Sequence, residues 1–237
     1  MNIFSNIIYF YKRKIQPGFR IKKDAIVIDI GSGDKPFWRA DVFVDDLSLG
    51  NVQRASETKT IHDIGKFVDA NVEKLPFKDN AFDFSFCSHL LEHVENPGLV
   101  IKEITRISKS GYIEIPNGVI ETVQPFVSHL WFVYRNKKKL IFVRKSKKMH
   151  EALYGNGRGF VSLINKVPDP FIRMYWKNNI DYEVIDQLKG NERYHSPLKL
   201  KRKINDNSIN FHTTMIKILR GLFYINKNVP SEILKKR

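Results

Sequence analysis

The chain has 237 residues, 42% of them hydrophobic, which suits one sizeable core and favours one elaborated domain over two separate domains. Its formal net charge is +15, and its single cysteine, Cys87, excludes an internal disulfide framework and suits a reducing compartment. The apolar run within residues 1–14 has the wrong length for a spanning helix and precedes its basic residues, so we predict a cytoplasmic protein without a signal peptide.

The positive charge is concentrated in three segments. Residues 1–23 hold six Lys or Arg and no acid, residues 135–148 hold eight and no acid, and residues 198–237 hold ten against two acids. Residues 24–134 instead hold 10 basic and 17 acidic side chains. Clustered positive charge attracts nucleic acid, anionic lipid headgroups or phosphorylated glycans, and a merely solvated surface is the alternative for each segment.

Short apolar runs that end in small or turn-forming residues alternate with helical signals through the acidic part of the chain. Continuous apolar runs are typical of parallel strands buried on both faces. Such strands are predicted over residues 25–30 (AIVIDI), 41–46 (DVFVDD), 82–88 (FDFSFCS) and 111–117 (GYIEIPN). Pro97 in a first turn and Gly111 as a stop predict a helix between the last two runs. Strands joined by helices form βαβ units, so we predict an α/β fold with helices on both faces of a mostly parallel sheet.

The ends of the predicted strands carry residues suited to binding a ligand, since sites in such sheets lie at the carboxyl ends. The first strand is followed by the turn Gly31-Ser32-Gly33, where glycine permits positive φ and opens the backbone to a cofactor. The second ends in Asp45 and Asp46, which can accept hydrogen bonds from ribose hydroxyls. Gly33 and Asp45 are closer in sequence than the roughly 20 residues usual in dinucleotide-binding folds, and a tight turn without a ligand is the alternative.

The stretch NVEKLPFKDNAFDFSFCSHLLEHVENP carries a family resemblance together with VIDIGSGDKP before it and IEIPN after it. These motifs, in this order over residues 25–117, resemble the class I S-adenosylmethionine-dependent methyltransferases, in particular the methyltransferase type 11 group. The resemblance implies a Rossmann-like, doubly wound, mostly parallel seven-stranded sheet. It also implies that S-adenosyl-L-methionine binds across the strand ends and leaves as S-adenosyl-L-homocysteine.

Carried over residue by residue, the resemblance implies a cofactor site along these strand ends. The implied residues are Asp29, Gly31, Ser32, Gly33, Asp45, Asp46, Asn71, Val72, Ser88 and His89. Asp45 would take the ribose hydroxyls, with Asp46 as the alternative if the register shifts by one. Asn71 stands where the family usually has Asp, so we expect its amide oxygen to accept from the adenine amino group, with Asp69 as the substitute. We assign no metal ligand.

Other family motifs are expected to position the site rather than to react. Leu75, Pro76 and Phe77 would pack a loop against the sheet. Glu92 is expected to hold the loop and helix in place after the apolar run over residues 82–88, with direct chemistry as the alternative. Ser88 and His89 would close the predicted strand over residues 82–88, which corresponds to the family's fourth strand, beside the sulfonium.

Methyl transfer from a sulfonium mainly requires that the acceptor be aligned and water excluded. A general base is needed only for a weak nucleophile such as a hydroxyl, and histidine suits that task. His89 and His129 are the predicted catalytic residues, with His93 as a weaker candidate. A positioning or surface role is the alternative for each of them.

The part of the chain after Asn117 is expected to choose the substrate. WFVY and KLIFV, joined by a basic polar turn, predict an inserted basic β-hairpin, with a helix as the alternative. Its charge and aromatic residues suit an anionic or glycan acceptor, and an oligomer contact is the alternative use. The predicted substrate-binding residues are Asn117, His129, Trp131 and Arg158, the last in the glycine-rich loop YGNGRGF.

We therefore predict one methyltransferase domain over residues 1–237. It divides into an N-terminal basic helix (1–23), the cofactor-binding core (24–117), the substrate-side insertion (118–165) and a C-terminal part with a basic amphipathic helix (166–237). The N-terminal helix is expected to pack on the sheet. The C-terminal helix either does the same or lies on an anionic membrane surface, which would place the protein peripherally on the inner face.

The predicted function is S-adenosylmethionine-dependent O-methylation of a sugar hydroxyl in polysaccharide biosynthesis or on a lipid-linked glycan. A small-metabolite or RNA methyltransferase and a non-catalytic binding protein of the same fold are the alternatives. No RNA-binding module is evident in the sequence, although its basic segments are compatible with nucleic acid. The oligomeric state and the methylated atom stay open.

Overall fold

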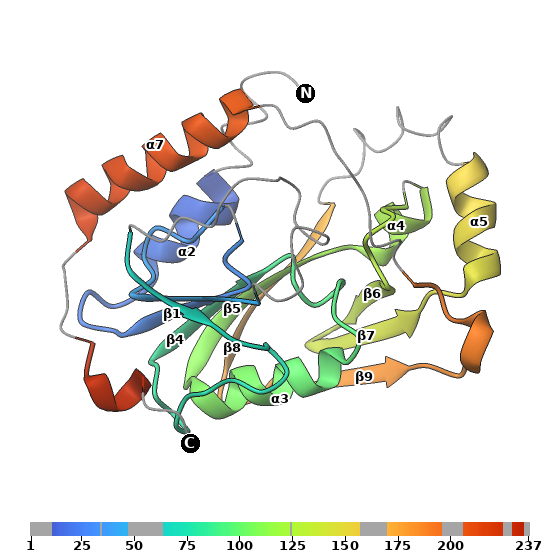
Figure 1. The fold of residues 1–237 in the computed structure, drawn as a ribbon, viewed down its shortest axis with the longest axis horizontal. Helices are drawn as coiled ribbons and strands as arrows, with labels where there is room; N and C mark the ends of the chain where they lie inside the picture. Colours follow the sequence, from blue (N-terminus) through green and yellow to red (C-terminus); the bar gives the residue numbers. More distant parts are fainter. Residues whose placement is uncertain are drawn as a thin grey trace.

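The computed structural model describes residues 11–33, 35–46, 64–123, 125–156, 170–195, 206–224 and 229–234. Figure 1 shows the arrangement of its helices and strands. The strands are β1 (Val27–Ile30), β2 (Val42–Asp45), β3 (Lys66–Asp69), β4 (Phe84–Ser88), β5 (Ser110–Pro116), β6 (Trp131–Asn136), β7 (Lys139–Arg144), β8 (Phe171–Lys177) and β9 (Tyr182–Ile185). The helices are α2 (Gln16–Phe19), α3 (Pro97–Ile107), α4 (Gly118–Val123), α5 (Lys147–Asn156) and α7 (Asp206–Phe223), with single helical turns at Tyr11–Ile15, Gly190–Glu192 and Ser231–Leu234.

The central sheet has the strand order β3-β2-β1-β4-β5-β8. Its first five strands are parallel, and β8 runs antiparallel to β5 along one edge. The predicted α/β fold with a mostly parallel sheet is therefore confirmed. Each of the four predicted strands is present: the first three are shorter than predicted, and the fourth is shifted by one residue toward the N-terminus. The implied seventh strand is not present: within the described ranges this sheet has six strands.

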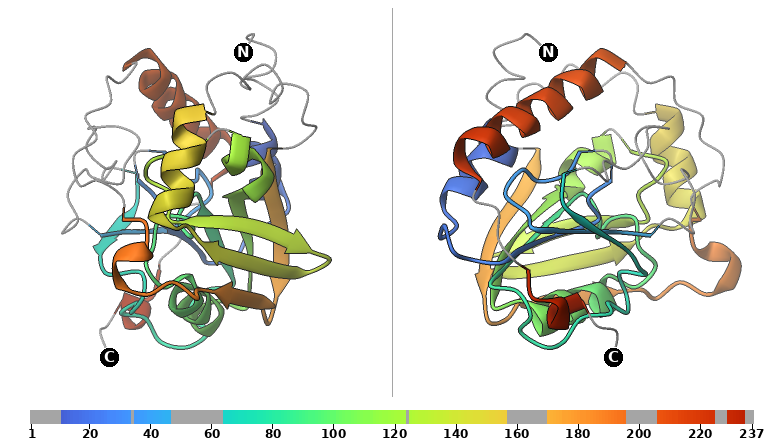
Figure 2. Two further views of the ribbon diagram at one scale, coloured as in Figure 1. Left: turned by 90° about the vertical axis from the view of Figure 1, so that its right-hand side faces the viewer. Right: turned by 60° about the vertical axis from the view of Figure 1, so that its left-hand side comes forward.

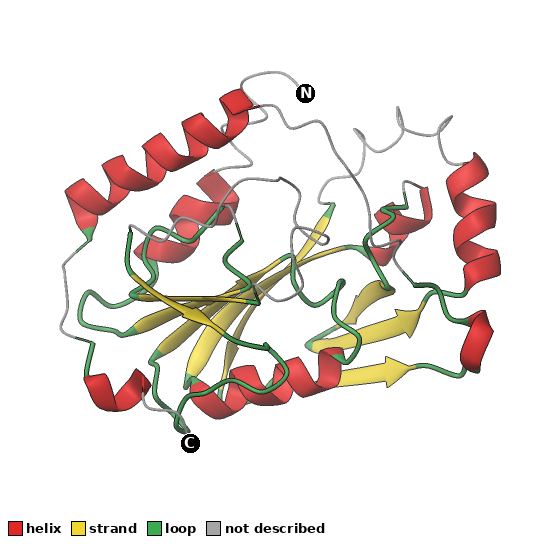
Figure 3. Ribbon diagram, in the orientation of Figure 1, coloured by secondary structure: helices red, strands yellow, loops and turns green. Residues whose placement is uncertain are grey.

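Apolar side chains cover both faces of the central sheet, and Figure 3 shows helices on either side of it. Ile28, Ile30 and Cys87 belong to the core shared with α3, where Val100, Ile101 and Ile104 are buried. Val27, Phe43, Phe86 and Tyr112 belong to a second core on the opposite face. Successive residues of a strand point to opposite faces, so both cores are built from the same short apolar runs.

The predicted βαβ pattern is wrong for the connection from β1 to β2, because the described residues of this connection form no helix. Residues 31–41 are fewer than the dozen or so that a helical crossover needs. Aromatic rings fill the space instead: Phe37 stacks on Phe86 with centroids 4.1 Å apart. A Cβ on Gly18 would lie 2.4 Å from the ring of Trp38, so glycine is needed there for close packing. This face of the sheet is covered by side chains and by remote segments of the chain.

Two of those remote segments come from opposite ends of the described chain. The turn Tyr11–Ile15 and α2 pack near Trp38, whose indole donates a hydrogen bond to Lys14 O at 2.8 Å. Helix α7 buries Ile216 and Leu219 in the same core. The Arg220 guanidinium donates to Trp38 O and Ala40 O at 2.8 and 2.7 Å. In the described residues both terminal helical segments therefore pack on the sheet, and residues 1–10 of the predicted N-terminal helix lie outside them.

The second sheet has the order β6-β7-β9 and lies to one side of the central sheet (Figure 2). β6 and β7 pair antiparallel around a turn at Lys137-Lys138, so the predicted hairpin is confirmed. β9 adds to β7 in parallel, and Tyr182 on β9 donates to Gly98 O on α3 at 3.3 Å. In the described part of the chain, no helix is both long and apolar enough for a membrane crossing.

Candidate active site

The glycine turn after β1 is anchored on the end of β2. Gly31 and Gly33 have φ values of 73° and 53°, which favour glycine. The Gly33 N–H donates to Asp45 Oδ2 at 2.7 Å, and the Gly31 N–H donates to Val44 O at 2.8 Å. Ser32 is buried, and its Oγ has no hydrogen-bond partner among the described residues. The structure thus brings together four of the predicted cofactor residues, Gly31, Ser32, Gly33 and Asp45, at one corner of the sheet.

Asp29 lies on the same corner but is shielded from solvent. Its Oδ2 accepts the Phe37 N–H at 2.7 Å. Burial raises the pKa of Asp29, although the nearby Lys14 opposes the rise. Burial likewise lowers the pKa of Lys14, and the charge of Arg13 adds to that effect. Lys14, whose ammonium donates to Lys35 O at 2.7 Å, is a charged neighbour of the predicted site that the sequence analysis did not assign.

The expected adenine end is more open. Asn71 is exposed, and its Oδ1 accepts the Glu73 N–H at 2.8 Å in a local turn. Val72 is buried in the core that includes α3. Asp69 pairs in register with Asp45 at the ends of β3 and β2, and the Asp46 N–H donates to Asp45 Oδ1 at 2.9 Å. The predicted roles of Asn71, Val72, Asp46 and Asp69 stay predictions.

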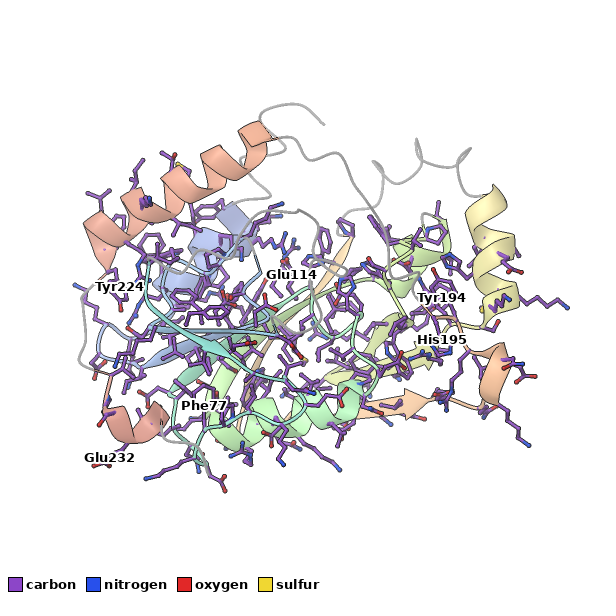
Figure 4. The ribbon with its side chains drawn as sticks, viewed as in Figure 1. Phe77, Glu114, Tyr194, His195, Tyr224 and Glu232 are labelled. Atoms are coloured by element: carbon purple, nitrogen blue, oxygen red, sulfur yellow. The ribbon has the colours of Figure 1, made fainter. Side chains whose placement is uncertain are left out.

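Glu114, two residues before the end of β5, is the centre of a buried ionic cluster near the middle of the molecule (Figure 4). Arg13 Nε lies 2.8 Å from Oε1, and Arg173 Nε lies 2.8 Å from Oε2. Tyr112 donates to Oε2 at 3.1 Å, and Ser88 donates to Oε1 at 3.3 Å. Burial opposes ionisation of Glu114, but the hydrogen bond from His89 and the charges of Arg13, His89 and Arg173 outweigh it and lower its pKa to about 2.

Of the residues in this cluster, only Ser88 and His89 were predicted from the sequence. Arg13 comes from the N-terminal segment and Arg173 from the edge strand β8, far from the strand that carries Glu114. A charge in the middle of the apolar run GYIEIPN was the available signal, because a buried acid requires partners. Since Arg13 also donates to Ser88 Oγ at 3.0 Å, the N-terminal segment reaches the end of β4 where the sulfonium was predicted.

His89 links the Glu114 cluster to a second acid. Its backbone has φ of 56°, uncommon for a residue other than glycine, and its N–H donates to Glu114 O at 2.9 Å. Its ring has Nδ1 3.1 Å from Glu92 Oε1 and Nε2 3.3 Å from Glu114 Oε1. Both nitrogens thus face carboxylates, which favours positioning over proton abstraction from an acceptor. The predicted catalytic role of His89 stays a prediction.

Glu92 and His93 come after His89 in this series of contacts that starts at Glu114. Burial opposes ionisation of Glu92, but the hydrogen bond from His89 and the charges of His93 and His129 lower its pKa to about 2. Glu92 Oε2 is buried without a hydrogen-bond partner in the described part of the chain. His93 Nδ1 lies 2.9 Å from Ser128 O, and burial lowers the pKa of His93 to about 4.

His129, the second predicted catalytic residue, is buried in this region. Its Nδ1 lies 2.8 Å from Glu121 Oε2, and Glu121 Oε1 binds the ammonium of Lys145. Phe126 stacks on the His129 ring, and the Phe126 N–H donates to Glu121 Oε1 at 2.6 Å. We call the resulting line of contacts the polar chain; its members are Glu114, His89, Glu92, His93, His129, Glu121 and Lys145. It joins the region near the end of β5 to the residue that follows β7.

The predicted substrate residues separate into three cases. The predicted substrate role of Trp131 is wrong, because its side chain is buried. Its indole donates to Val94 O at 2.8 Å, and the Arg144 guanidinium lies over its ring, so the ring is not available to a sugar. Asn117 Oδ1 accepts the Val119 N–H at 3.0 Å at the start of α4, and its substrate role stays a prediction. Arg158 lies outside the described residues.

The basic hairpin is less available to a ligand than its charge suggested. Arg144 pairs with Glu95 at 2.8 Å, and Lys145 pairs with Glu121, so two of its cations are buried in ion pairs. Lys139 pairs with Glu183 at 2.6 Å on the surface. The exposed cations of this segment are Arg135, Lys137, Lys138, Lys147 and Lys148.

Comparison with known proteins gives matches over part of the chain. Residues 29–113 match a family model described as a methyltransferase domain. An uncharacterised protein of Methanocaldococcus jannaschii is 32% identical over 114 residues, covering 46% of this chain and 48% of that protein. The sterol 4-C-methyltransferase of Caenorhabditis elegans is 29% identical over 97 residues, covering 41% and 28% respectively. The chain thus spans less than two thirds of the length of these curated relatives.

Among solved structures, a protein of Pyrococcus horikoshii is 19% identical, with a TM-score of 0.41 and coverage of 65% of this chain and 82% of that chain. An S-adenosylmethionine-dependent methyltransferase of Thermotoga maritima is 17% identical, with a TM-score of 0.36 and coverage of 48% and 59%. Both likenesses are too distant to add to the assignment. The family match, in a segment that contains the last two residues of β1, all of β2 to β4, the glycine turn and Asp45, shows that residues 29–113 are similar to a methyltransferase domain.

Proposed function

We propose that this protein transfers a methyl group from S-adenosyl-L-methionine to a hydroxyl acceptor. The observation that carries the proposal is the contact between the Gly33 N–H and Asp45 Oδ2, which fixes the glycine turn beside a carboxylate at the carboxyl edge of a parallel sheet. The bound cofactor supplies an activated methyl group on a sulfonium. The residues of the chain bind it, orient the acceptor and exclude water.

The residues at this corner fit such a cofactor. Among the described residues, a Cβ on Gly33 would meet only Asp45 Oδ2, at 3.9 Å, so on that side its backbone is open to a close ligand. The buried Ser32 hydroxyl lacks a partner in the described residues and can bond a polar ligand group. Each carboxylate oxygen has two lone pairs, so Asp45 can accept ribose hydroxyls while it keeps its backbone bonds. Ser32, Gly33 and Asp45 would therefore hold the cofactor, with Gly31 shaping the turn.

Charged groups of the neighbouring strand ends would form the acceptor side. Arg13, Arg173 and His89 surround Glu114 near the end of β5, which makes this edge strongly polar. The polar chain continues from there to His129, the residue that we propose as the base for a hydroxyl acceptor. A base is needed because a neutral hydroxyl is a weak nucleophile toward the sulfonium.

For the acceptor we propose a sugar hydroxyl on a polysaccharide or lipid-linked glycan. Support comes from the exposed cations Arg135, Lys137 and Lys138 on the hairpin, which suit an anionic glycan. Two curated relatives are named for other acceptors, a sterol in one case and demethylmenaquinone in the other. A small metabolite, RNA and an anionic membrane surface are therefore competing partners that the experiment must separate.

The test is methyl transfer from isotopically labelled S-adenosyl-L-methionine to a panel of acceptors. The panel contains anionic oligosaccharides, polyprenyl-diphosphate-linked sugars, total RNA and a set of small phenols and carboxylates. We expect label on an acid-stable, base-stable sugar ether, and none with the Asp45→Ala variant. Label on RNA or on a small metabolite would refute the glycan acceptor. Absence of cofactor binding would refute the methyltransferase proposal and favour a non-catalytic protein of the same fold.

A further inference from the structure

Three side chains of types that bind metal ions converge within the polar chain. One ligand-type atom from each of Glu92, His93 and His129 lies within 4.8 Å of those of the other two. Glu92 and His129 are buried, and the His93 side chain is 13% exposed. The rings of His93 and His129 meet edge to face with centroids 4.7 Å apart. The cluster therefore combines two imidazoles and one carboxylate in a space with little water.

Both histidine rings are oriented by bonds on the far side of the cluster. His93 Nδ1 faces Ser128 O at 2.9 Å, an acceptor that requires a proton on this nitrogen. His129 Nδ1 faces Glu121 Oε2 at 2.8 Å in the same way. Each neutral ring then keeps the lone pair of Nε2, and His93 Nε2 lies 3.8 Å from Glu92 Oε1. Metal-binding histidines characteristically donate their other ring N–H to a carbonyl or a carboxylate.

Glu92 supplies an independent observation that points to a missing ligand. Its Oε1 is engaged by His89 Nδ1 at 3.1 Å. Its Oε2 is buried and without a hydrogen-bond partner in the described ranges of the chain. Leaving a charged oxygen unsatisfied in the interior is costly, and a cation at the cluster would remove that cost.

We propose that Glu92, His93 and His129 bind one divalent transition-metal ion, with Zn²⁺ as the expected occupant of this ligand set. Ligand atoms on a tetrahedral ion lie about 3.3 Å apart when the Zn–N distance is about 2.0 Å, so the side chains would close by on the order of 1 Å. Three protein ligands leave a fourth position for water or for an acceptor oxygen. The proposal holds whatever the acceptor is. While the ion is bound, His129 Nε2 is a ligand, so metal binding and the general-base role proposed for His129 exclude each other.

The experiment titrates the tag-free, metal-stripped full chain with Zn²⁺ by calorimetry and with Co²⁺ by absorption spectroscopy. We expect one ion per chain and a Co²⁺ spectrum of nitrogen and oxygen ligands, without a thiolate charge-transfer band. Glu92→Gln and His129→Asn should each weaken binding by more than about 100-fold, since loss of an outer-sphere partner alone costs about 10- to 100-fold. His195→Asn is the matched control, because that side chain is 66% exposed and lies toward the side of the molecule that carries α5 (Figure 4).

Several results would overturn the proposal. Absence of Zn²⁺ and Co²⁺ binding by the wild-type chain would do so, as would binding that survives in folded Glu92→Gln and His129→Asn variants. Binding of Mg²⁺ alone would contradict the transition-metal assignment. If a variant fails to fold, as judged by circular dichroism, the Co²⁺ spectrum of the wild-type chain decides: a thiolate band from Cys87, or no band, contradicts the site.

Discussion

The cofactor corner and the far end of the polar chain are two polar regions built in different ways. At the cofactor corner, Gly33 and Asp45 meet through a backbone N–H and a carboxylate that are twelve positions apart in the chain. At the far end, His129 is held by Glu121, and Glu121 is held by Lys145 from beyond β7. The first region uses backbone geometry with open polar groups, whereas the second uses buried charges that neutralise one another.

Because of this difference, we expect substitutions in the two regions to affect different properties of the protein. A buried charge that loses its partner keeps its desolvation cost, so damage at the far end should appear as lost stability. A carboxylate beside a turn loses mainly its ligand, so damage at the cofactor corner should appear as lost affinity. The comparison fails if substitutions in the two regions have interchangeable effects.

Glu121→Gln should give the largest effect on stability. It leaves the buried Lys145 ammonium without its acidic partner, which costs about 3–5 kcal/mol of unfolding free energy for a broken buried pair. Urea unfolding followed by circular dichroism measures this. Lys139→Met is the control, since its salt bridge to Glu183 is exposed and its loss should leave stability unchanged. Equal effects of the two substitutions would show that the buried pair is no more important than a surface pair.

Glu114→Gln should lower stability at neutral pH and flatten its acid dependence. The pKa of Glu114 is about 2 in the folded chain against an ordinary value of 4.5, so its contribution is present above pH 4.5 and is lost as pH falls toward 2. A shift of this size corresponds to on the order of 3 kcal/mol. Unfolding free energies of wild type and variant across that pH window provide the measurement, and parallel pH profiles would contradict the assigned ion pairs.

Asp45→Ala should weaken S-adenosyl-L-methionine binding by about 10- to 100-fold, the equivalent of one charge-assisted hydrogen bond of about 1.5–3 kcal/mol. Equilibrium dialysis with labelled cofactor gives the affinity. Asp181→Ala provides a matched exposed control, since Asp181 lies beside β9 and away from the turn. If Asp181→Ala weakened binding as much as Asp45→Ala, the corner would not be the cofactor site.

His129→Ala should lower turnover by about 10²-fold or more, the usual contribution of a general base. Cofactor affinity should stay nearly unchanged, because His129 lies at the far end of the polar chain from the glycine turn. Turnover and cofactor dissociation constants measured on the same preparation separate the two effects. Loss of cofactor affinity with intact turnover would reverse the roles assigned to the two regions.

The exposed hairpin cations should give the smallest effect. Lys137→Asn combined with Lys138→Gln keeps the turn, since Asn accepts the φ of 54° at position 137. Binding to anionic vesicles or anionic oligosaccharides should fall by at most about 30-fold, at about 1 kcal/mol for each of the two Lys near an anionic surface, and should fall further with added salt. Cosedimentation with vesicles and calorimetry with oligosaccharides separate these two partners. Salt-insensitive binding would contradict an electrostatic role.

The cofactor corner could be predicted because its information is local. Apolar runs located β1, β2, β4 and β5, and the turn residues after them marked the strand ends. β3 was not predicted because it is a strand of only four residues that are exposed or half-buried. β8 was not predicted because its residues alternate between buried and more exposed positions, as in an antiparallel edge strand, and form no continuous apolar run. The pattern of apolar residues therefore predicted the central strands of the sheet but not its two edge strands.

The charged clusters could not be predicted because their members are far apart in sequence. Arg13, Glu114 and Arg173 meet only after the N-terminal segment and β8 have packed against β5. The prediction for Trp131 was wrong because an aromatic residue in a basic hairpin suggested an exposed ring. The first three residues of β6, which include Trp131, are buried. Partner choice and side-chain exposure depend on tertiary contacts that one sequence does not reveal.

Calorimetric titration of the wild-type chain with S-adenosyl-L-methionine tests the central claim most directly. The predicted result is saturable binding of one cofactor per chain, weakened in Asp45→Ala and retained in His129→Ala. Absence of binding to the folded wild-type chain would contradict the claim that the corner formed by Ser32, Gly33 and Asp45 is a cofactor site.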